Sequence, residues 1–194
     1  ATGHGLPSAL ITASARSCFS VLDKLASESL YQLDPANMLS VANRVVFDSA
    51  QGKIMMTCFV GILDFEKMTI TYASAAHNPP WLFSKSNNGK SSLVSLISRG
   101  ERLGEASDLR TPYEVKQASF SQGDTLFLYT DGILEGKNLE GIQYGKKQAR
   151  EVLEDAIHHA PREILNNLVV DFLTHNAGKD LDDDITLALV RILS

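Results

Sequence analysis

Residues 123–132 read Gly-Asp-Thr-Leu-Phe-Leu-Tyr-Thr-Asp-Gly. The turn residues Gly123 and Asp124 precede a short apolar run from Thr125 to Tyr129, which is typical of a buried strand. The run ends at Asp131 and Gly132. A carboxylate at a strand end is held by a rigid scaffold, as binding and catalytic side chains need to be. The stretch therefore predicts a strand that carries a functional carboxylate at its end.

A second acidic segment lies near the C-terminus. Asp182, Asp183 and Asp184 stand directly before an apolar run over 185–193, which we predict to be the final strand. Adjacent carboxylates repel one another unless cations or solvent screen them. Mg²⁺ and Mn²⁺ prefer such oxygen ligands. Taken singly, each segment also has a simpler interpretation, because Asp-Gly is a common turn and an acidic triplet is commonly a solvated loop.

Helices precede and follow a series of short strands. Pro7 and the pair Asp34-Pro35 mark the first turns of two helices. The apolar positions at helical spacing are Ile11, Ala15, Cys18, Phe19, Leu22 and Leu25 in the first helix, and Met38, Leu39, Ala42, Val45 and Val46 in the second. Strands are predicted over 54–63, 68–72, 81–83, 93–97, 113–120 and 125–129, and later helices over 145–158 and 161–177. This order predicts an α/β (α+β) fold with mostly antiparallel sheets covered by helices.

The composition is that of an ordinary globular chain. Of 194 residues, 44% are hydrophobic and 21% are charged, and the net charge of -5 argues against a nucleic-acid surface. No stretch reaches the roughly 18–20 apolar residues of a membrane span. Cys18 and Cys58 lie in apolar runs, which indicates reduced thiols in the core. With no internal linker, residues 1–194 are predicted to form one domain, and the glycine-rich start without Met suggests a fragment of a longer chain.

Five segments follow one another in a recognisable order. They are Thr-Gly-His-Gly-Leu-Pro-Ser-Ala-Leu (2–10), Phe-Val-Gly-Ile-Leu-Asp (59–64), Ser-Ala-Ala-His-Asn-Pro-Pro-Trp-Leu (74–82), the 123–132 stretch, and Asp-Asp-Ile-Thr-Leu (183–187). In this order, which spans the whole chain, they resemble the SpoIIE/RsbU-type branch of the PP2C-like (PPM) serine/threonine phosphatases.

The resemblance implies a PP2C-like sandwich of two mostly antiparallel β-sheets flanked by helices, with two Mn²⁺ or Mg²⁺ ions between the sheets. Asp131 and Asp183 would be metal ligands. Asp184 would be either a weaker ligand or a group that contacts the ligands rather than the metal. The ligand set would also include the backbone carbonyl of Ala1. The residues that would line the site are Thr2, Gly3, His4 and Gly132.

In the family, an aspartate bridges the two metals and stands directly before the segment that begins here with Ala1. Here that aspartate would precede Ala1. We therefore expect it to be missing, together with one or two N-terminal strands, and we expect this fragment to bind metal weakly and to show little hydrolysis. Two smaller departures are Ala76, where the family usually has glycine, and Ile142, where it usually has glutamate.

The implied reaction is hydrolysis of phosphoserine or phosphothreonine on a regulatory partner protein by a metal-activated water. The implied partner is a phosphorylated anti-sigma-factor antagonist with a STAS fold. The N-terminal part of the parent chain would be a sensor, a receiver or a membrane segment, and this domain would be its cytoplasmic output without direct membrane contact. The resemblance also allows a homodimer.

Several alternatives stay open from the residues alone. A pseudophosphatase or signalling-interaction module would keep the fold without catalysis. His4 is either a general acid or a structural residue of the turn, and the structural role is favoured. His77, before Asn-Pro-Pro, is expected to stiffen a turn. The apolar faces of the first two helices are most simply core, although movement of these helices to gate metal binding is a second hypothesis.

Overall fold

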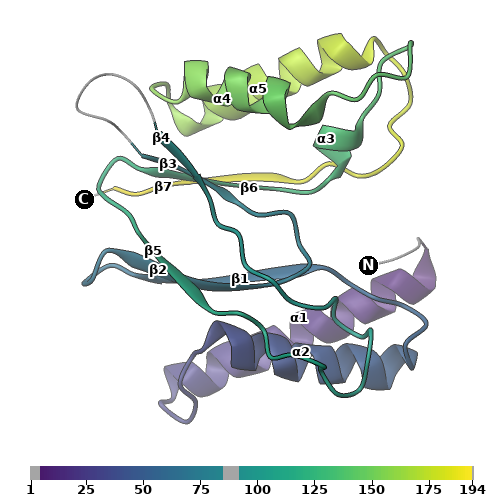
Figure 1. Cartoon of the computed structure of the whole chain (residues 1–194), viewed down its shortest axis with the longest axis vertical. Coiled ribbons are helices and arrows are strands. Elements are labelled where there is room, and N and C mark those ends of the chain that lie inside the picture. Colours follow the sequence, from purple (N-terminus) through teal and green to yellow (C-terminus); the bar gives the residue numbers. More distant parts are fainter. Residues whose placement is uncertain (1–4, 85–91, 194) are drawn as a thin grey trace. The chain divides into compact units, whose positions relative to one another are not determined.

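Two antiparallel sheets organise the chain, one in each of two units (Figure 1). The computed structural model describes residues 5–84 and 92–193. The first unit comprises Ala1–Pro79 and Leu96–Ser119, and the second comprises Pro80–Ser95 and Phe120–Ser194. The predicted class, a mixed α/β chain with two antiparallel sheets flanked by helices, is confirmed. The prediction of a single domain concerns how the two units are joined, and it stays a prediction.

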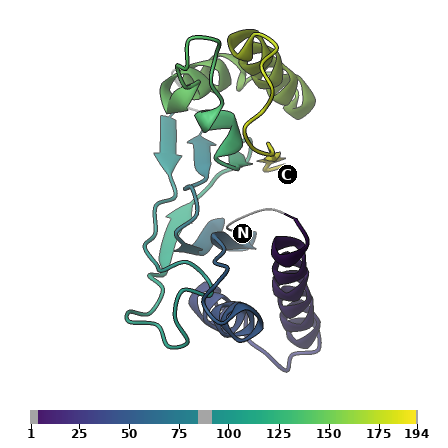
Figure 2. The same cartoon turned by 90° about the vertical axis from the view of Figure 1, so that its right-hand side faces the viewer.

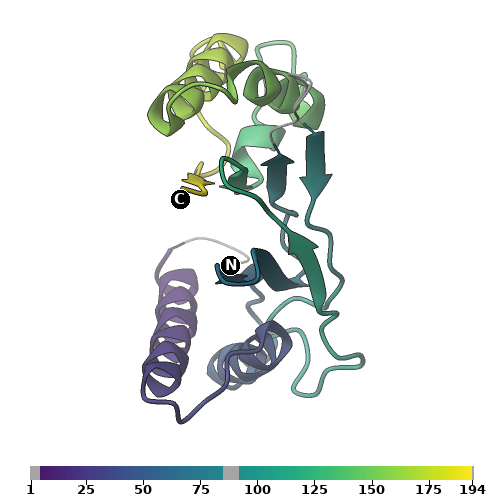
Figure 3. The ribbon, with the colours of Figure 1, turned by 90° about the vertical axis from the view of Figure 1, so that its left-hand side faces the viewer.

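The helices of the first unit begin where the sequence predicts. α1 spans Leu6–Ser27 with a proline in its first turn. α2 spans Pro35–Ala50, and the Asp34 carboxylate caps it by accepting a hydrogen bond from the Asn37 N–H at 2.8 Å. The two helices pack on each other (Figure 3). The buried core that they form with the sheet is Ile11, Ala15, Leu39, Ala42, Val46, Ala50, Ala73, Ala75, Leu103 and Tyr113.

The sheet of the first unit has the order β1-β2-β5. Its strands are β1 (Cys58–Asp64), β2 (Thr69–Ala75) and β5 (Lys116–Ser119). β1 and β2 form the predicted hairpin, with Asp64 opposite Thr69. The Asp64 carboxylate closes the turn by accepting hydrogen bonds from the Glu66 and Lys67 N–H groups at 3.1 and 2.9 Å.

β1 begins later than the predicted start at residue 54. Before it, Met56 and Leu103 exchange two backbone hydrogen bonds of 3.0 and 2.9 Å as an isolated antiparallel bridge. The irregular segment that contains Leu103 is also tied to α2, because the Gly104 N–H donates to the Asn43 side-chain oxygen at 2.8 Å. Asn43 is 2% exposed, so its amide replaces water for a buried backbone group.

The second unit contains the sheet β4-β3-β6-β7 with two long helices over one face (Figures 1 and 2). The strands are β3 (Trp81–Ser84), β4 (Ser92–Ser95), β6 (Thr125–Tyr129) and β7 (Leu187–Arg191), and the helices are α3 (Gly132–Glu135), α4 (Gly145–Ala156) and α5 (Pro161–Asn176). The core between sheet and helices includes Trp81, Phe83, Phe127, Tyr129, Leu153, Ile164, Leu168 and Phe172.

Arg191, in the last strand, connects the sheet of this unit to the end of α4. Its guanidinium donates hydrogen bonds to the carbonyls of Ile157 and His159 at 2.7 and 2.6 Å, and to the Thr125 hydroxyl at 3.2 Å. Both carbonyls lie just after the end of α4, where the helix dipole is negative. The side chain therefore joins the sheet to α4 through a charge-assisted contact.

Most predicted elements of the second unit are found with shifted ends. The strand over 125–129 matches β6, whereas the strand predicted over 185–193 is confined to β7. The four-residue helix α3 was not predicted from the sequence. Among the described residues, none of the helices combines the length and the apolar character that crossing a bilayer requires.

Ala76 gives the first testable prediction, because its backbone is in the left-handed region at a φ of 53°. This conformation is strained for alanine, and the exposed methyl group contributes little packing. We expect Ala76→Gly to raise the free energy of unfolding by about 0.5–1 kcal/mol, measured by urea denaturation. The control Ala118→Gly, in strand β5, is expected to lower it by a similar amount. A loss of stability in Ala76→Gly would contradict the strain argument.

Candidate metal centre

Asp131 lies at the end of β6, where the sequence predicts it. It follows Thr130 and begins the turn into α3. The Leu134 and Glu135 N–H groups donate to the Asp131 carbonyl at 2.8 and 2.9 Å, so its main chain is fixed by the first turn of that helix. Its side chain makes no capping hydrogen bond and the residue is exposed. The carboxylate is thus available to a ligand from solvent.

The second acidic segment lies directly before β7. Asp182, Asp183 and Asp184 are all exposed. The Asp184 N–H donates to the Asp183 carboxylate at 2.8 Å, and the Asp182 carboxylate lies 3.6 Å from the Lys179 ammonium. One of the three charges therefore has a cationic neighbour, which lowers the repulsion within the triplet.

Hydrogen bonds join the two segments beyond the last pair of the β6–β7 ladder, Tyr129 and Leu187. The Thr130 N–H donates to the Thr186 carbonyl at 3.0 Å, and the Thr186 N–H donates to the Thr130 hydroxyl at 2.9 Å. The same hydroxyl donates to the Asp184 carbonyl at 3.3 Å. The segments that carry Asp131 and Asp184 therefore lie side by side.

Gly132 shows how close the two segments are. A Cβ atom added there would lie 2.5 Å from the Asp184 carbonyl oxygen, closer than any side chain tolerates. Only glycine allows the turn after Asp131 to run against the acidic segment. Gly132 was predicted to line the site, and it is buried at this junction.

The donor set suits a hard divalent cation. Carboxylate oxygens are the ligands that Mg²⁺ and Mn²⁺ take in proteins. Within residues 5–84 and 92–193, no three or more His, Cys, Asp or Glu side chains are arranged as a metal site. The described carboxylates have the right donor atoms, but by themselves they could supply only part of a cation site. Ala1, Thr2, Gly3 and His4, also predicted at the site, lie outside the described residues.

Thr130 is the residue of this junction that sequence reasoning missed. It stands inside the Tyr-Thr-Asp-Gly segment, but its hydroxyl carries no metal-ligand signature. Only the pairing of β6 with β7 shows that this hydroxyl continues the ladder. A polar residue directly after an apolar strand and before the acidic residue is the signal that could have pointed to it.

The other candidate groups of the sequence have structural surroundings. The His77 ring lies 3.1 Å from the Thr57 hydroxyl, and the His77 backbone N–H donates to the Ser74 hydroxyl at 3.1 Å, as a turn residue would. Cys18 and Cys58 are free thiols. Burial raises the pKa of Cys18, and that of Cys58 to about 11, so neither is a thiolate at neutral pH.

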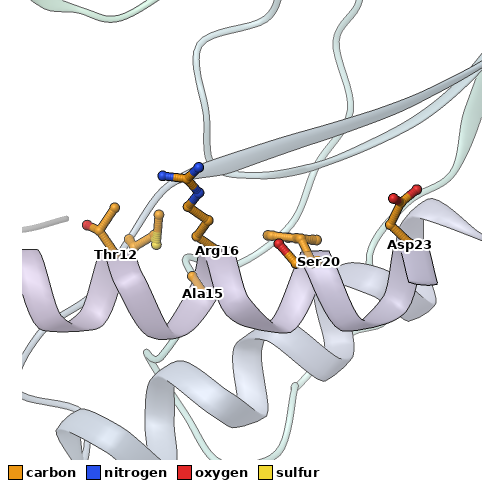
Figure 4. Close-up of a pocket in the computed structure, with 7 residues that line it drawn as sticks. Thr12, Ala15, Arg16, Ser20 and Asp23 are labelled. Atoms are coloured by element: carbon orange, nitrogen blue, oxygen red, sulfur yellow. The ribbon is translucent and has the colours of Figure 1, made fainter. Parts of the chain in front are cut away.

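The first unit contains a groove of about 470 Å³ beside α1 (Figure 4). Arg16 and Asp23 extend from one side of the helix at its rim. The full lining is Thr12, Ala15, Arg16, Phe19, Ser20, Asp23 and Met56. None of these residues was predicted at the metal site.

Comparison with known proteins gives a family and two curated relatives. The family model described as stage II sporulation protein E (SpoIIE) matches residues 1–193. Phosphoserine phosphatase RsbU of Bacillus subtilis is 28% identical over 193 residues, which are 97% of this chain and 52% of RsbU. Protein IcfG of Synechocystis is 25% identical over 134 residues, 69% of this chain and 20% of IcfG. The chain thus spans about half the length of one relative and a fifth of the other.

Three solved structures share the fold. The SiaA-PP2C domain of Pseudomonas aeruginosa has a TM-score of 0.77 and 22% identity, over 98% of this chain and 71% of that one. The RsbU and RsbW domains of Rv1364c from Mycobacterium tuberculosis have a TM-score of 0.70 and 23% identity, over 99% of this chain and 51% of that one. RsbX in complex with magnesium has a TM-score of 0.63 and 20% identity, over 97% of this chain and 75% of that one. At these identities the likeness is one of fold.

The Thr130 hydroxyl gives a prediction for the junction. Thr130→Val keeps the shape but removes both hydrogen bonds to the acidic segment, so we expect it to lower the free energy of unfolding by about 1 kcal/mol in urea denaturation. Thr130→Ser keeps the hydroxyl and is expected to stay within about 0.5 kcal/mol of the wild type. Equal losses in both variants would show that the hydroxyl does not hold the junction.

Proposed function

The chain belongs to the stage II sporulation protein E (SpoIIE) family, and on this premise we propose that it is a PPM-type phosphatase that removes phosphate from serine or threonine of a regulatory protein. RsbU is named a phosphoserine phosphatase, and nearly the whole of this chain aligns with about half of RsbU. The observation that carries the proposal is the junction of β6 and β7, where Asp131 and the Asp183–Asp184 pair leave neighbouring strands at the same end.

The proposed cofactor is Mn²⁺ or Mg²⁺. Asp131 and Asp183 would hold the cation, with Asp184 as a weaker ligand or a group behind them, and Ala1 would add its carbonyl. The solved structure of RsbX contains magnesium, which supports this cofactor for a protein of the same fold. Two such ions, when bound, would lower the pKa of a bound water and neutralise charge on the phosphoryl oxygens.

The protein's own contribution is to hold its ligands in place. Thr130, Gly132 and the first turn of α3 fix the main chain on both sides of Asp131, so little reorganisation is needed on binding. The high pKa values of Cys18 and Cys58 argue against a cysteine nucleophile, which is consistent with direct attack by water.

The proposed substrate is a phosphorylated anti-sigma-factor antagonist with a STAS fold. The support is the likeness to RsbU and to a structure that joins an RsbU domain to an RsbW domain. In this proposal the chain is a cytoplasmic output domain, governed by a sensor or receiver region of the parent protein, and two copies associate as a homodimer.

One observation favours a second candidate, a pseudophosphatase or signalling module. Among the described residues, no three or more His, Cys, Asp or Glu side chains are placed so that they could hold a metal ion. Such a module would bind the phosphorylated partner without releasing phosphate. Hydrolysis of p-nitrophenyl phosphate with added Mn²⁺ separates the two candidates, and it should be measured on this chain and on any longer natural form.

The ligand assignment predicts the effect of removing either carboxylate. In a longer natural form of the protein, we expect Asp131→Asn and Asp183→Asn to lower Mn²⁺-stimulated turnover at least about 100-fold, because an amide is a far weaker ligand for a hard cation. Circular dichroism should show an unchanged fold, since both side chains are exposed. The matched control is Asp182→Asn in the same triplet, where Lys179 is the neighbour and turnover is expected to stay within about threefold. Wild-type turnover in either of the first two variants would overturn the assignment.

A further inference from the structure

The segment after Asp131 is anchored to α5 by a carboxylate that the proposed reaction does not use. One oxygen of Asp171 accepts hydrogen bonds from the Tyr144 hydroxyl at 2.7 Å and from the Gln148 amide at 2.8 Å. Tyr144 is 3% exposed. Burial, together with the bond to Asp171, raises the pKa of Tyr144, so the phenol stays protonated and remains a donor.

Tyr144 also fixes the main chain on its other side. Its N–H donates to the Gly136 carbonyl at 2.8 Å. Its ring packs edge-on against Phe172 and His175, each with centroids 5.4 Å apart. The His175 ring in turn lies 2.9 Å from the Ile142 carbonyl. Residues of α5 therefore contact the segment 136–144 at Ile142 and Tyr144, and Tyr144 connects these contacts to Gly136.

A continuous path of hydrogen bonds leads from this anchor to Asp131. The Gly136 N–H donates to the Gly132 carbonyl at 3.1 Å, and the Glu135 N–H donates to the Asp131 carbonyl at 2.9 Å. Gly136 packs closely against α5, since a Cβ atom there would lie 2.5 Å from the Phe172 ring, and the position therefore requires glycine. The position of the Asp131 main chain is thus coupled to the position of Tyr144.

A core residue that served packing alone would not need this hydroxyl. Burying a hydroxyl costs free energy unless it is hydrogen-bonded, and phenylalanine would fill the same space without that cost. A bond to a fixed carboxylate adds direction, which packing does not. This directional contact is what a loop beside a metal ligand requires.

We propose that Tyr144 and Asp171 are positioning residues, which hold the segment from Asp131 to Gly136 so that the Asp131 carboxylate is directed at a divalent cation. That a cation binds at Asp131 rests on the proposed function. That Tyr144 and Asp131 are coupled rests on the path of hydrogen bonds between them. Neither residue touches the substrate in this arrangement.

The test compares variants that break or keep the bond. Tyr144→Phe removes only the hydroxyl, and Asp171→Leu removes the acceptor. Asp171→Asn keeps an oxygen that can accept both bonds. Mn²⁺ affinity of a longer natural form of the protein, measured by electron paramagnetic resonance of the free ion, is expected to fall about tenfold in the first two variants and to stay within about threefold in Asp171→Asn. The control Glu154→Gln removes an exposed α4 carboxylate paired with Arg150 and should change nothing.

A second measurement separates this inference from the proposed function. Hydrogen exchange of the amides of residues 132–136, without metal, should be faster in Tyr144→Phe and Asp171→Leu than in Asp171→Asn. Lower thermal stability with unchanged Mn²⁺ affinity would show a purely structural role and overturn the proposal. Unchanged exchange would overturn it as well. Lack of Mn²⁺ affinity in a longer natural form would count against the proposed function, and the exchange comparison, made on this chain, would then decide the coupling. If Tyr144→Phe does not fold, the two Asp171 variants carry both measurements.

Discussion

The candidate site depends on the hydrogen bonds at the end of the β6–β7 ladder. The ladder runs from Thr125 opposite Arg191 to Tyr129 opposite Leu187, and Thr130 then continues it with one backbone bond and one side-chain bond. Two segments that lie far apart in the sequence therefore leave the sheet at one point. Strand pairing sets the spacing of their backbones, so no long loop is needed to place the two acidic segments side by side.

The sequence was most informative where short-range physical signals are strong. Asp34 and Pro35 mark the start of α2 because a side-chain cap and a fixed φ act within one turn. β6 was predicted to the residue, since a Gly-Asp turn precedes an apolar run that ends in polar residues. The start of β1 was not predictable. The apolar run over 54–63 contains no local boundary, and the bridge from Met56 to Leu103 depends on a distant segment.

The acidic residues of the candidate site were predicted from strand ends and from their family pattern, whereas the residues proposed to support them were not. Thr130 and Tyr144 act through partners on other elements, Thr186 and Asp171, and spacing along the chain contains no trace of these pairings. The short helix α3 has too few residues for a periodic pattern to appear. Ala76, noted as a small departure from the family, proves to be a strained backbone position.

The antiparallel register of β6 and β7 also divides the chain into parts that tolerate changes of length and parts that do not. One residue inserted between Tyr129 and Asp131, or between Asp184 and Leu187, would turn the following side chains to the opposite side of the strand. The exposed turn at Ala177 and Gly178, after α5, is different, because doubling a loop's length costs only about 0.6 kcal/mol of closure entropy. Tags, reporters or natural insertions are therefore best accommodated there, where the polypeptide can grow without moving either carboxylate.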